Sequence, residues 1–263
     1  LFSPERGGKA AGINRALREA TGDVVIMTDA NNVLGRHSVR AAARHFADPA
    51  VWAVAGRRGE SGSPYDRYED LLRRLETRSG SVAAMSGEFM AVRRDRLPEL
   101  PEDVVNDDLW LLCQIVRGGG RAVYERDAAS VEEAVGTGEE LARRSRIGAG
   151  RAMLIGELPG LPPAFALRLV SHKFGRLALP FLMLAALGSS LALADRRPYR
   201  GALAAQLSVY ALGGLSAAGL DAPGPARVAS RAARQLLVGN VAVAIGTVRG
   251  LRGRQSVRWQ AVR

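Results

Sequence analysis

The sequence DVVIMTDANN, residues 23–32, contains the pattern that decides the fold. Val24–Met27 is an unbroken apolar run of strand length, and polar residues follow it at once. Such a run predicts a parallel strand that is covered on both faces of its sheet. Ligands of open α/β sheets bind beyond the carboxyl ends of strands, so Asp29 and Asn31 stand where a ligand is expected. The alternative is that these residues form only a turn.

Helical and strand patterns alternate on both sides of this strand. Alternation of this kind predicts an α/β layer structure with a sheet at its centre. The predicted helices cover 9–20, 36–47, 65–78 and 107–119, and the predicted strands lie at 51–56, within 81–95 and at 121–129.

The character of the chain changes beyond residue 150. The segments 177–194 and 201–220 contain no charged residue, and each has the ~18–20 residues that a helix needs to cross a bilayer. The segment 235–248 is shorter and either spans or lies at the interface. We therefore expect a juxtamembrane linker at 151–176, two or three transmembrane helices within 177–250, and a basic tail at 251–263. The alternative is a set of buried helices in a soluble core.

The charge of the chain is divided unevenly along its 263 residues. The net charge is +11, but residues 1–140 carry −4 and residues 141–263 carry +15. Basic residues beside apolar runs are typical of cytoplasmic membrane flanks, so no nucleic-acid partner is expected. Cys113 is the single cysteine. It excludes an intrachain disulfide and is predicted to be a core residue.

Five polar clusters follow one another along this layout. They are Arg6/Lys9/Asn14, Asp29-Ala30-Asn31, Ser86-Gly87, Asp107-Asp108 and Arg143-Arg144-Ser145-Arg146. Their order resembles that of the inverting family 2 glycosyltransferases, in the membrane-embedded branch that includes cellulose, poly-N-acetylglucosamine and hyaluronan synthases. The resemblance implies a GT-A-like (Rossmann-like) mixed-sheet domain over 1–150, followed by the transmembrane helices.

The first cluster lies in RGGKAAGINRAL, residues 6–17. It is not a P-loop, because the first glycine and the hydroxyl residue after Lys9 are both missing. It resembles the family segment that borders the nucleotide-sugar site, which implies that Arg6, Lys9 and Asn14 bind the nucleotide-diphosphate sugar, expected to be a UDP-sugar. The alternative is a basic helix start without a ligand.

The second and fourth clusters carry the implied chemistry. Asp29 and Asn31 match the family's metal-binding pair, which implies Mg²⁺ or Mn²⁺, with an uncharged amide in place of the second carboxylate. Asp107 and Asp108 match the family's catalytic pair. Asp108 is expected to be the general base that deprotonates the acceptor hydroxyl. The alternative is that the two aspartates only cap a helix.

The remaining clusters are implied to contact the substrates. Ser86 and Gly87 fall in the segment beneath the acceptor site. Arg146 matches the arginine that neutralises the leaving diphosphate, with Arg143 in the same motif, and Ile147 stands where processive synthases have tryptophan. The alternative for these arginines is a patch that attracts anionic lipid.

Together these residues predict a multi-pass cell-membrane enzyme with a cytoplasmic catalytic domain. It would move a sugar from a nucleotide-diphosphate sugar to a glycan or lipid-linked acceptor, with membrane lipid as a further partner. Family members begin with a strand and an aspartate that hold the nucleoside, and none precedes Arg6. We therefore expect a truncated domain that lacks its first strands and binds donor poorly alone. The alternative is a non-catalytic membrane scaffold that retains the fold.

Overall fold

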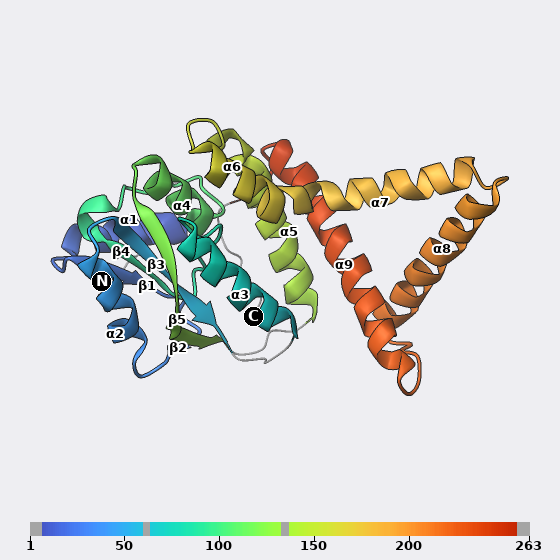
Figure 1. Ribbon diagram of the computed structural model, residues 1–263, viewed down its shortest axis with the longest axis horizontal. Coiled ribbons are helices and arrows are strands. Elements are labelled where there is room, and N and C mark those ends of the chain that lie inside the picture. The colour runs from blue at the N-terminus through green and yellow to red at the C-terminus, as the bar shows by residue number, and fades with distance from the viewer. Residues whose placement is uncertain (1–6, 60–63, 133–136, 257–263) are drawn as a thin grey trace. The chain divides into compact units, whose positions relative to one another are not determined.

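The structure is a computed structural model that describes residues 7–59, 64–132 and 137–256 (Figure 1). The chain forms two compact units. Unit 1 comprises residues 1–135, 154–172 and 256–263, and unit 2 comprises residues 136–153 and 173–255. Each unit is described by itself.

Unit 1 is built on a sheet whose five described strands run in the order β1-β4-β3-β5-β2. β3 and β5 are parallel, and the other neighbours are antiparallel. The predicted mixed α/β architecture is confirmed. The strands are β1 (Val24–Met27), β2 (Asn32–Leu34), β3 (Val51–Arg58), β4 (Met90–Arg93) and β5 (Arg121–Glu132).

The predicted parallel pairing of the strand at 24–27 is wrong. β1 pairs with β4 in antiparallel register, Val24 opposite Arg93 and Met27 opposite Met90, and it is an edge strand of the described sheet. Only Met27 of the four residues is buried. An apolar run reports that a strand packs against a core, but it carries no information on the direction of its neighbour.

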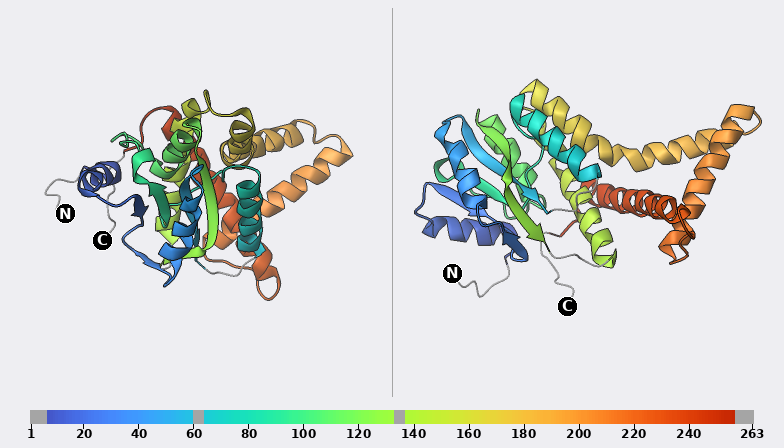
Figure 2. Two further views of the ribbon diagram at one scale, coloured as in Figure 1. Left: turned by 60° about the vertical axis from the view of Figure 1, so that its left-hand side comes forward. Right: turned by 60° about the horizontal axis from the view of Figure 1, so that its bottom comes forward.

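The helices of unit 1 flank the sheet. α3 packs against β5, and Figure 2 shows the two elements side by side. Residues 36–47, predicted as one helix, form α2 followed by a 3₁₀ turn. The helices are α1 (Lys9–Glu19), α2 (Ser38–Ala43), α3 (Pro64–Arg78), α4 (Asp107–Arg117) and α6 (Pro163–Leu169), with 3₁₀ turns at Arg44–Ala47, Arg94–Arg96 and Leu154–Glu157.

The core of unit 1 lies between the sheet and these helices. Val54 of β3, Ala91 of β4 and Phe89, which immediately precedes β4, pack with Ala42 of α2. α4 adds a buried apolar face that contains Cys113, 1% exposed, which confirms its predicted core position. This core holds the carboxyl end of β1 and the start of α4 in fixed places.

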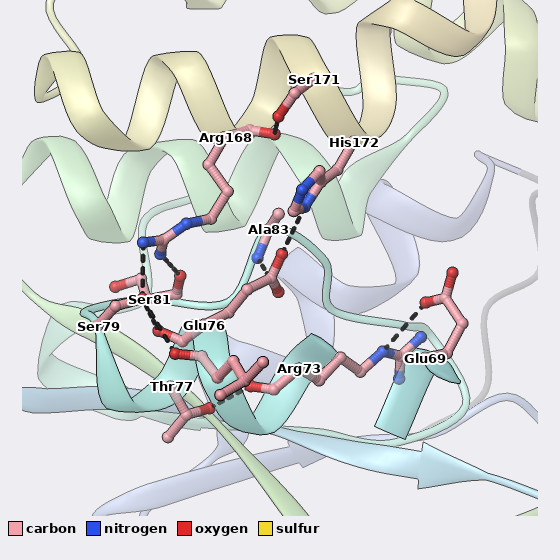
Figure 3. Close-up of polar contacts among 11 residues, drawn as sticks. Glu69, Arg73, Glu76, Thr77, Ser79, Ser81, Ala83, Arg168, Ser171 and His172 are labelled. Carbon is pink, nitrogen blue, oxygen red and sulfur yellow. Dashed lines mark hydrogen bonds and ion pairs between the residues drawn. The ribbon is translucent and has the colours of Figure 1, made fainter. Parts of the chain in front are cut away.

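Residues 168–172 of unit 1 are tied to α3 and the residues after it by polar groups. Glu76 Oε1 lies 2.8 Å from His172 Nδ1, while Glu76 Oε2 accepts a hydrogen bond of 3.0 Å from the N–H of Ala83. Figure 3 shows His172 pointing at Glu76 and Arg168 reaching towards Ser79 and Ser81. His172 itself lies in a π-helical turn, Val170–Phe174, that follows α6.

Unit 2 consists of helices. α5 and α9 run side by side (Figures 1 and 2). Their backbones are so close that a Cβ added at Gly246 would overlap the carbonyl oxygen of Ser145, and one at Gly250 that of Ala149. The helices are α5 (Thr137–Met153), α7 (Gly175–Ala192), α8 (Arg197–Ala217) and α9 (Ala226–Leu251).

Among the described residues, one helical stretch is long and apolar enough to cross a membrane. It is Pro163–Ala192, which comprises α6, the π-helical turn and α7. Only 22% of its apolar window is buried, which differs from the core helix of a soluble protein. The helices α8 and α9 coincide with the other two apolar segments of the sequence. The expectation of two or three transmembrane helices stays a prediction for these two.

Candidate active site

The centre of the site is the side chain of Lys9. Its Nζ lies 3.2 Å from Asp29 Oδ1 and 3.2 Å from Asp107 Oδ2. The Asp107 side chain is only 13% exposed, whereas those of Lys9 and Asp29 are 35% and 39% exposed. Residues from three separate predicted clusters therefore meet at one ammonium group.

Each of the three residues is placed by the start or end of an element. Gly8, with φ 93°, turns the chain into α1, and Lys9 is the first residue of that helix. Asp29 follows the end of β1 by two residues, and Asp107 is the first residue of α4. Glycine adopts a backbone conformation of positive φ at little cost. Gly8 therefore allows the turn that brings Lys9 into the site.

The carboxylates around Lys9 decide its charge. Burial opposes the ammonium form, but the negative charges of Asp107, Asp29 and Asp108 outweigh burial and raise the pKa of Lys9 above its ordinary value. Lys9 is therefore a permanent cation at neutral pH.

Gly87 leaves the space that this arrangement needs. A Cβ at Gly87 would lie 2.7 Å from Lys9 Nζ and 3.1 Å from Asp29 Oδ2. Its neighbours fix the local turn: Ser86 donates to the Glu88 carboxylate, and Thr28 Oγ1 donates a hydrogen bond of 2.9 Å to the carbonyl of Glu88. The predicted residues Ser86 and Gly87 thus lie at the same site as Asp29.

Asp107 and Asp108, at the start of α4, do more than cap the helix. Asn106 is the N-cap residue, but its side chain makes no capping hydrogen bond. Asp107 turns to Lys9 instead, and Asp108 Oδ1 accepts a hydrogen bond of 2.7 Å from the N–H of Leu109. The positive end of the helix dipole stabilises both negative charges.

The segment after Asp29 combines a turn with polar side chains. The N–H of Asn32 donates to the carbonyl of Asp29 at 3.1 Å, and Asn31 is exposed. The amide oxygen and nitrogen of Asn32 are buried, and neither has a hydrogen-bond partner in the described part of the chain. A buried polar group without a partner is rare. Asn32 was missed in the sequence, where the doubled asparagine was the only signal.

The oxygen donors at this end of β1 suit a hard divalent cation. Within residues 7–59, 64–132 and 137–256, no three acidic, histidine or cysteine side chains gather in a metal-binding group. Mg²⁺ in nucleotide enzymes is commonly held by one or two carboxylates together with substrate phosphates. Asp29 and Asn31 carry oxygen atoms of the kind that such an ion binds, and their role as its ligands stays a prediction.

Asn14, predicted to bind the donor, is buried and bonded to the backbone of Leu100. It is 5% exposed. Its amide nitrogen donates to the carbonyl of Leu100 at 2.7 Å, and its amide oxygen accepts the N–H of Leu100 at 2.8 Å. Because both polar groups of the amide are engaged with this backbone, the geometry gives Asn14 a positioning role for α1 instead of a contact with substrate.

Three predicted arginines lie outside the described part of unit 1. Arg6 lies outside the described residues. Arg143 and Arg146 are half-buried on α5, which belongs to unit 2. Their predicted contact with a diphosphate stays a prediction.

Comparison with solved structures finds proteins of similar fold. The mannosyltransferase PcManGT from Pyrobaculum calidifontis, solved in complex with GDP-Man and Mn²⁺, is 28% identical with a TM-score of 0.73. The match covers 97% of this chain and 70% of that one. Glucosyl-3-phosphoglycerate synthase from Mycobacterium tuberculosis is 17% identical with a TM-score of 0.43, and the match covers 61% of this chain and 57% of that one.

Comparison with curated protein sequences gives no significant match. The family model described as "Glycosyltransferase like family 2" matches residues 2–147, which include Lys9, Asp29, Gly87, Asp107 and Asp108. Since this match spans more than half of the chain, the protein is a member of glycosyltransferase-like family 2.

Proposed function

We propose that the protein is an inverting, metal-assisted glycosyltransferase that takes a sugar from a nucleotide-diphosphate sugar. The observation that carries the proposal is the meeting of Asp29 and Asp107 at Lys9, with Gly87 keeping the space beside them open. Three sequence motifs of the family thus converge on one point of unit 1.

The proposed base is Asp108. Its carboxylate sits on the first turn of α4, with Oδ1 held by the N–H of Leu109 at 2.7 Å, so the carboxylate has a fixed orientation. It would accept the proton of the acceptor hydroxyl as that oxygen attacks the anomeric carbon. Asp107 would keep Lys9 and the start of α4 in register for this step.

Asp29 and Asn31 are the proposed ligands of Mg²⁺ or Mn²⁺. When bound, the ion would neutralise charge on the departing diphosphate. Lys9 would contact a phosphate oxygen, and Arg6, Arg143 and Arg146 are proposed as further cations for the same group. Mn²⁺ is present in the complex of the 28% identical mannosyltransferase, which supports a divalent metal here.

The donor is proposed to be a nucleotide-diphosphate sugar with either a uracil or a guanine base. The family segment at residues 6–17 led to the expectation of a UDP-sugar, whereas the mannosyltransferase was solved with GDP-Man. GDP-mannose therefore belongs in the same donor screen as the UDP-sugars. Ser86 and Gly87 are proposed to lie beneath the acceptor.

A membrane location and the synthase-like branch complete the proposal. The apolar helix Pro163–Ala192 is mostly exposed. The charge-free segment 201–220 begins within α8, and the shorter apolar segment 235–248 lies within α9. We propose two or three spans, a cytoplasmic catalytic domain, and a glycan or lipid-linked acceptor at the membrane. Nucleic acid is not a proposed partner.

The test is metal-dependent donor hydrolysis and sugar transfer by the full-length protein in membranes. Asp108→Asn should remove both activities in the presence of Mg²⁺ or Mn²⁺, while Asp103→Asn, an exposed acidic residue of the preceding loop, should retain them. If folded protein releases no UDP, GDP or dTDP from any sugar donor, the non-catalytic scaffold replaces the enzyme. A scaffold would also be indifferent to Asp108→Asn.

A further inference from the structure

Lys9 stands between two carboxylates that come from distant parts of the chain. Its Nζ is equally far, 3.2 Å, from Asp29 Oδ1 and Asp107 Oδ2. One ammonium group therefore holds the turn after β1 and the start of α4 together. A small cation between the same two carboxylates would make contacts of the same kind.

Three carboxylates act on Lys9. Asp107, Asp29 and Asp108 each stabilise its ammonium form electrostatically. Asp107 is only 13% exposed, and a largely buried carboxylate needs a partner of opposite charge. The site thus attracts a cation whether or not substrate is present.

We propose that Lys9 is a built-in counter-cation that holds Asp29 and Asp107 together in the metal-free protein and competes with the divalent metal for Asp29. This inference rests on the proposed function, because it takes Asp29 to be a metal ligand. When the metal binds with a nucleotide diphosphate, the displaced ammonium group lies beside the incoming phosphates, which are natural partners for it. Lys9 would thereby link metal binding to donor binding.

Gly87 supports this role independently. A Cβ at Gly87 would lie only 2.7 Å from Lys9 Nζ, so the ammonium group could not keep its present position beside a larger residue. The ammonium group is therefore seated in a place that the backbone keeps open.

The experiment measures Mn²⁺ binding to the purified full chain by electron paramagnetic resonance, without nucleotide. Lys9→Met removes the competing cation, and Lys9→Arg retains a charge. Arg18→Met is the matched control, because it removes a cation from the same helix whose partner is the exposed Glu99 at 3.1 Å. Melting temperatures with and without Mn²⁺ are measured in parallel, and Mn²⁺ binding to wild type is repeated with UDP and with GDP.

Lys9→Met is expected to bind Mn²⁺ about three- to tenfold more tightly than wild type, because the metal no longer competes with the partly exposed ion pair between Lys9 and Asp29. Its metal-free melting temperature should fall by about 2–4 °C, and Mn²⁺ should restore it. Lys9→Arg and Arg18→Met should bind Mn²⁺ as wild type does.

Equal or weaker Mn²⁺ binding by Lys9→Met would overturn the inference. If wild type still binds Mn²⁺ with UDP or GDP in that case, the proposed function survives and Lys9 serves the phosphates alone. If neither protein binds Mn²⁺ even with nucleotide, the proposed metal-assisted reaction fails, and the inference fails with it.

Discussion

Lys9 and Asp107 are each the first residue of a helix, and their side chains form an ion pair of 3.2 Å across 98 positions of sequence. A cation at a helix start is unfavourable for the helix dipole, whereas an anion there is favourable. The first turn of α1 contains no acidic residue to compensate Lys9. Lys9 is therefore placed where the site needs it, and the carboxylates of other elements stabilise it there.

Gly87→Ala should lower sugar transfer at least tenfold while the protein stays folded. The added Cβ would crowd Lys9 Nζ and Asp29 Oδ2 and push them apart, and small displacements of catalytic groups have large effects on rate. The measurement is kcat/KM beside circular dichroism. Gly12→Ala is the control, because a Cβ at Gly12 meets nothing within 4 Å. Full activity of Gly87→Ala would show that the space is not needed.

Asn14→Ala should destabilise the protein by about 2–3 kcal/mol, because it leaves a buried N–H and a buried carbonyl of Leu100 without partners. Urea unfolding measures the loss. The neighbouring exposed Arg15→Ala should change the free energy of unfolding by less than about 0.5 kcal/mol. If Asn14→Ala kept its stability and lost donor affinity, Asn14 would be a substrate ligand as the sequence suggested.

Glu76→Ala should lower the free energy of unfolding by about 3 kcal/mol. Glu76 is 5% exposed and holds both His172 and the N–H of Ala83 (Figure 3), and removal of one partner from a buried polar pair is costly. Protease cleavage within 158–163 should also become faster, because that segment precedes the residues that Glu76 anchors. Arg78→Ala, exposed at the end of the same helix, should leave both measurements unchanged.

Glu125 should make stability depend on pH in the acid range. Burial raises its pKa, but hydrogen bonds from Arg44, from the N–H of Asp127 and from His45 outweigh burial and lower the pKa below 4.5. A lowered pKa in the folded state stabilises the protein above the unfolded value, and this stabilisation disappears as the pH falls through the folded value. The difference in unfolding free energy between wild type and Glu125→Gln should therefore shrink from about pH 5 to about pH 3. A constant difference would contradict the assignment.

Much of unit 1 could be predicted because local pattern and local structure coincide there. The apolar run at 24–27, the polar switch at Asp29 and the amphipathic helix from Asp107 all depend on neighbours in sequence. The pairing direction of β1 could not be predicted, because it depends on which strand lies beside it. No strand is predicted at β2, because Asn32–Leu34 has too few residues to show a strand pattern.

The site was predictable as a set of residues but not as a set of contacts. Motif spacing pointed to Lys9, Asp29 and Asp107, whereas their shared ion pairs follow from the tertiary fold. Asn14 was assigned by its motif alone, and its bond to Leu100 joins positions 86 apart. Asn32 was missed for the same reason, because burial of an amide cannot be deduced from its neighbours in sequence.

The fit of α9 on α5 has a practical consequence for anyone who shortens this chain to obtain an easily handled enzyme. The backbone of α5 at Ser145 and Ala149 packs directly on Gly246 and Gly250 of α9. One face of α5 is therefore complementary to a helix that lies about a hundred residues later in the sequence. A chain cut after α6 would expose that surface to water and leave the arginine motif on a helix without its neighbour. Expression trials should therefore keep α9 together with α5.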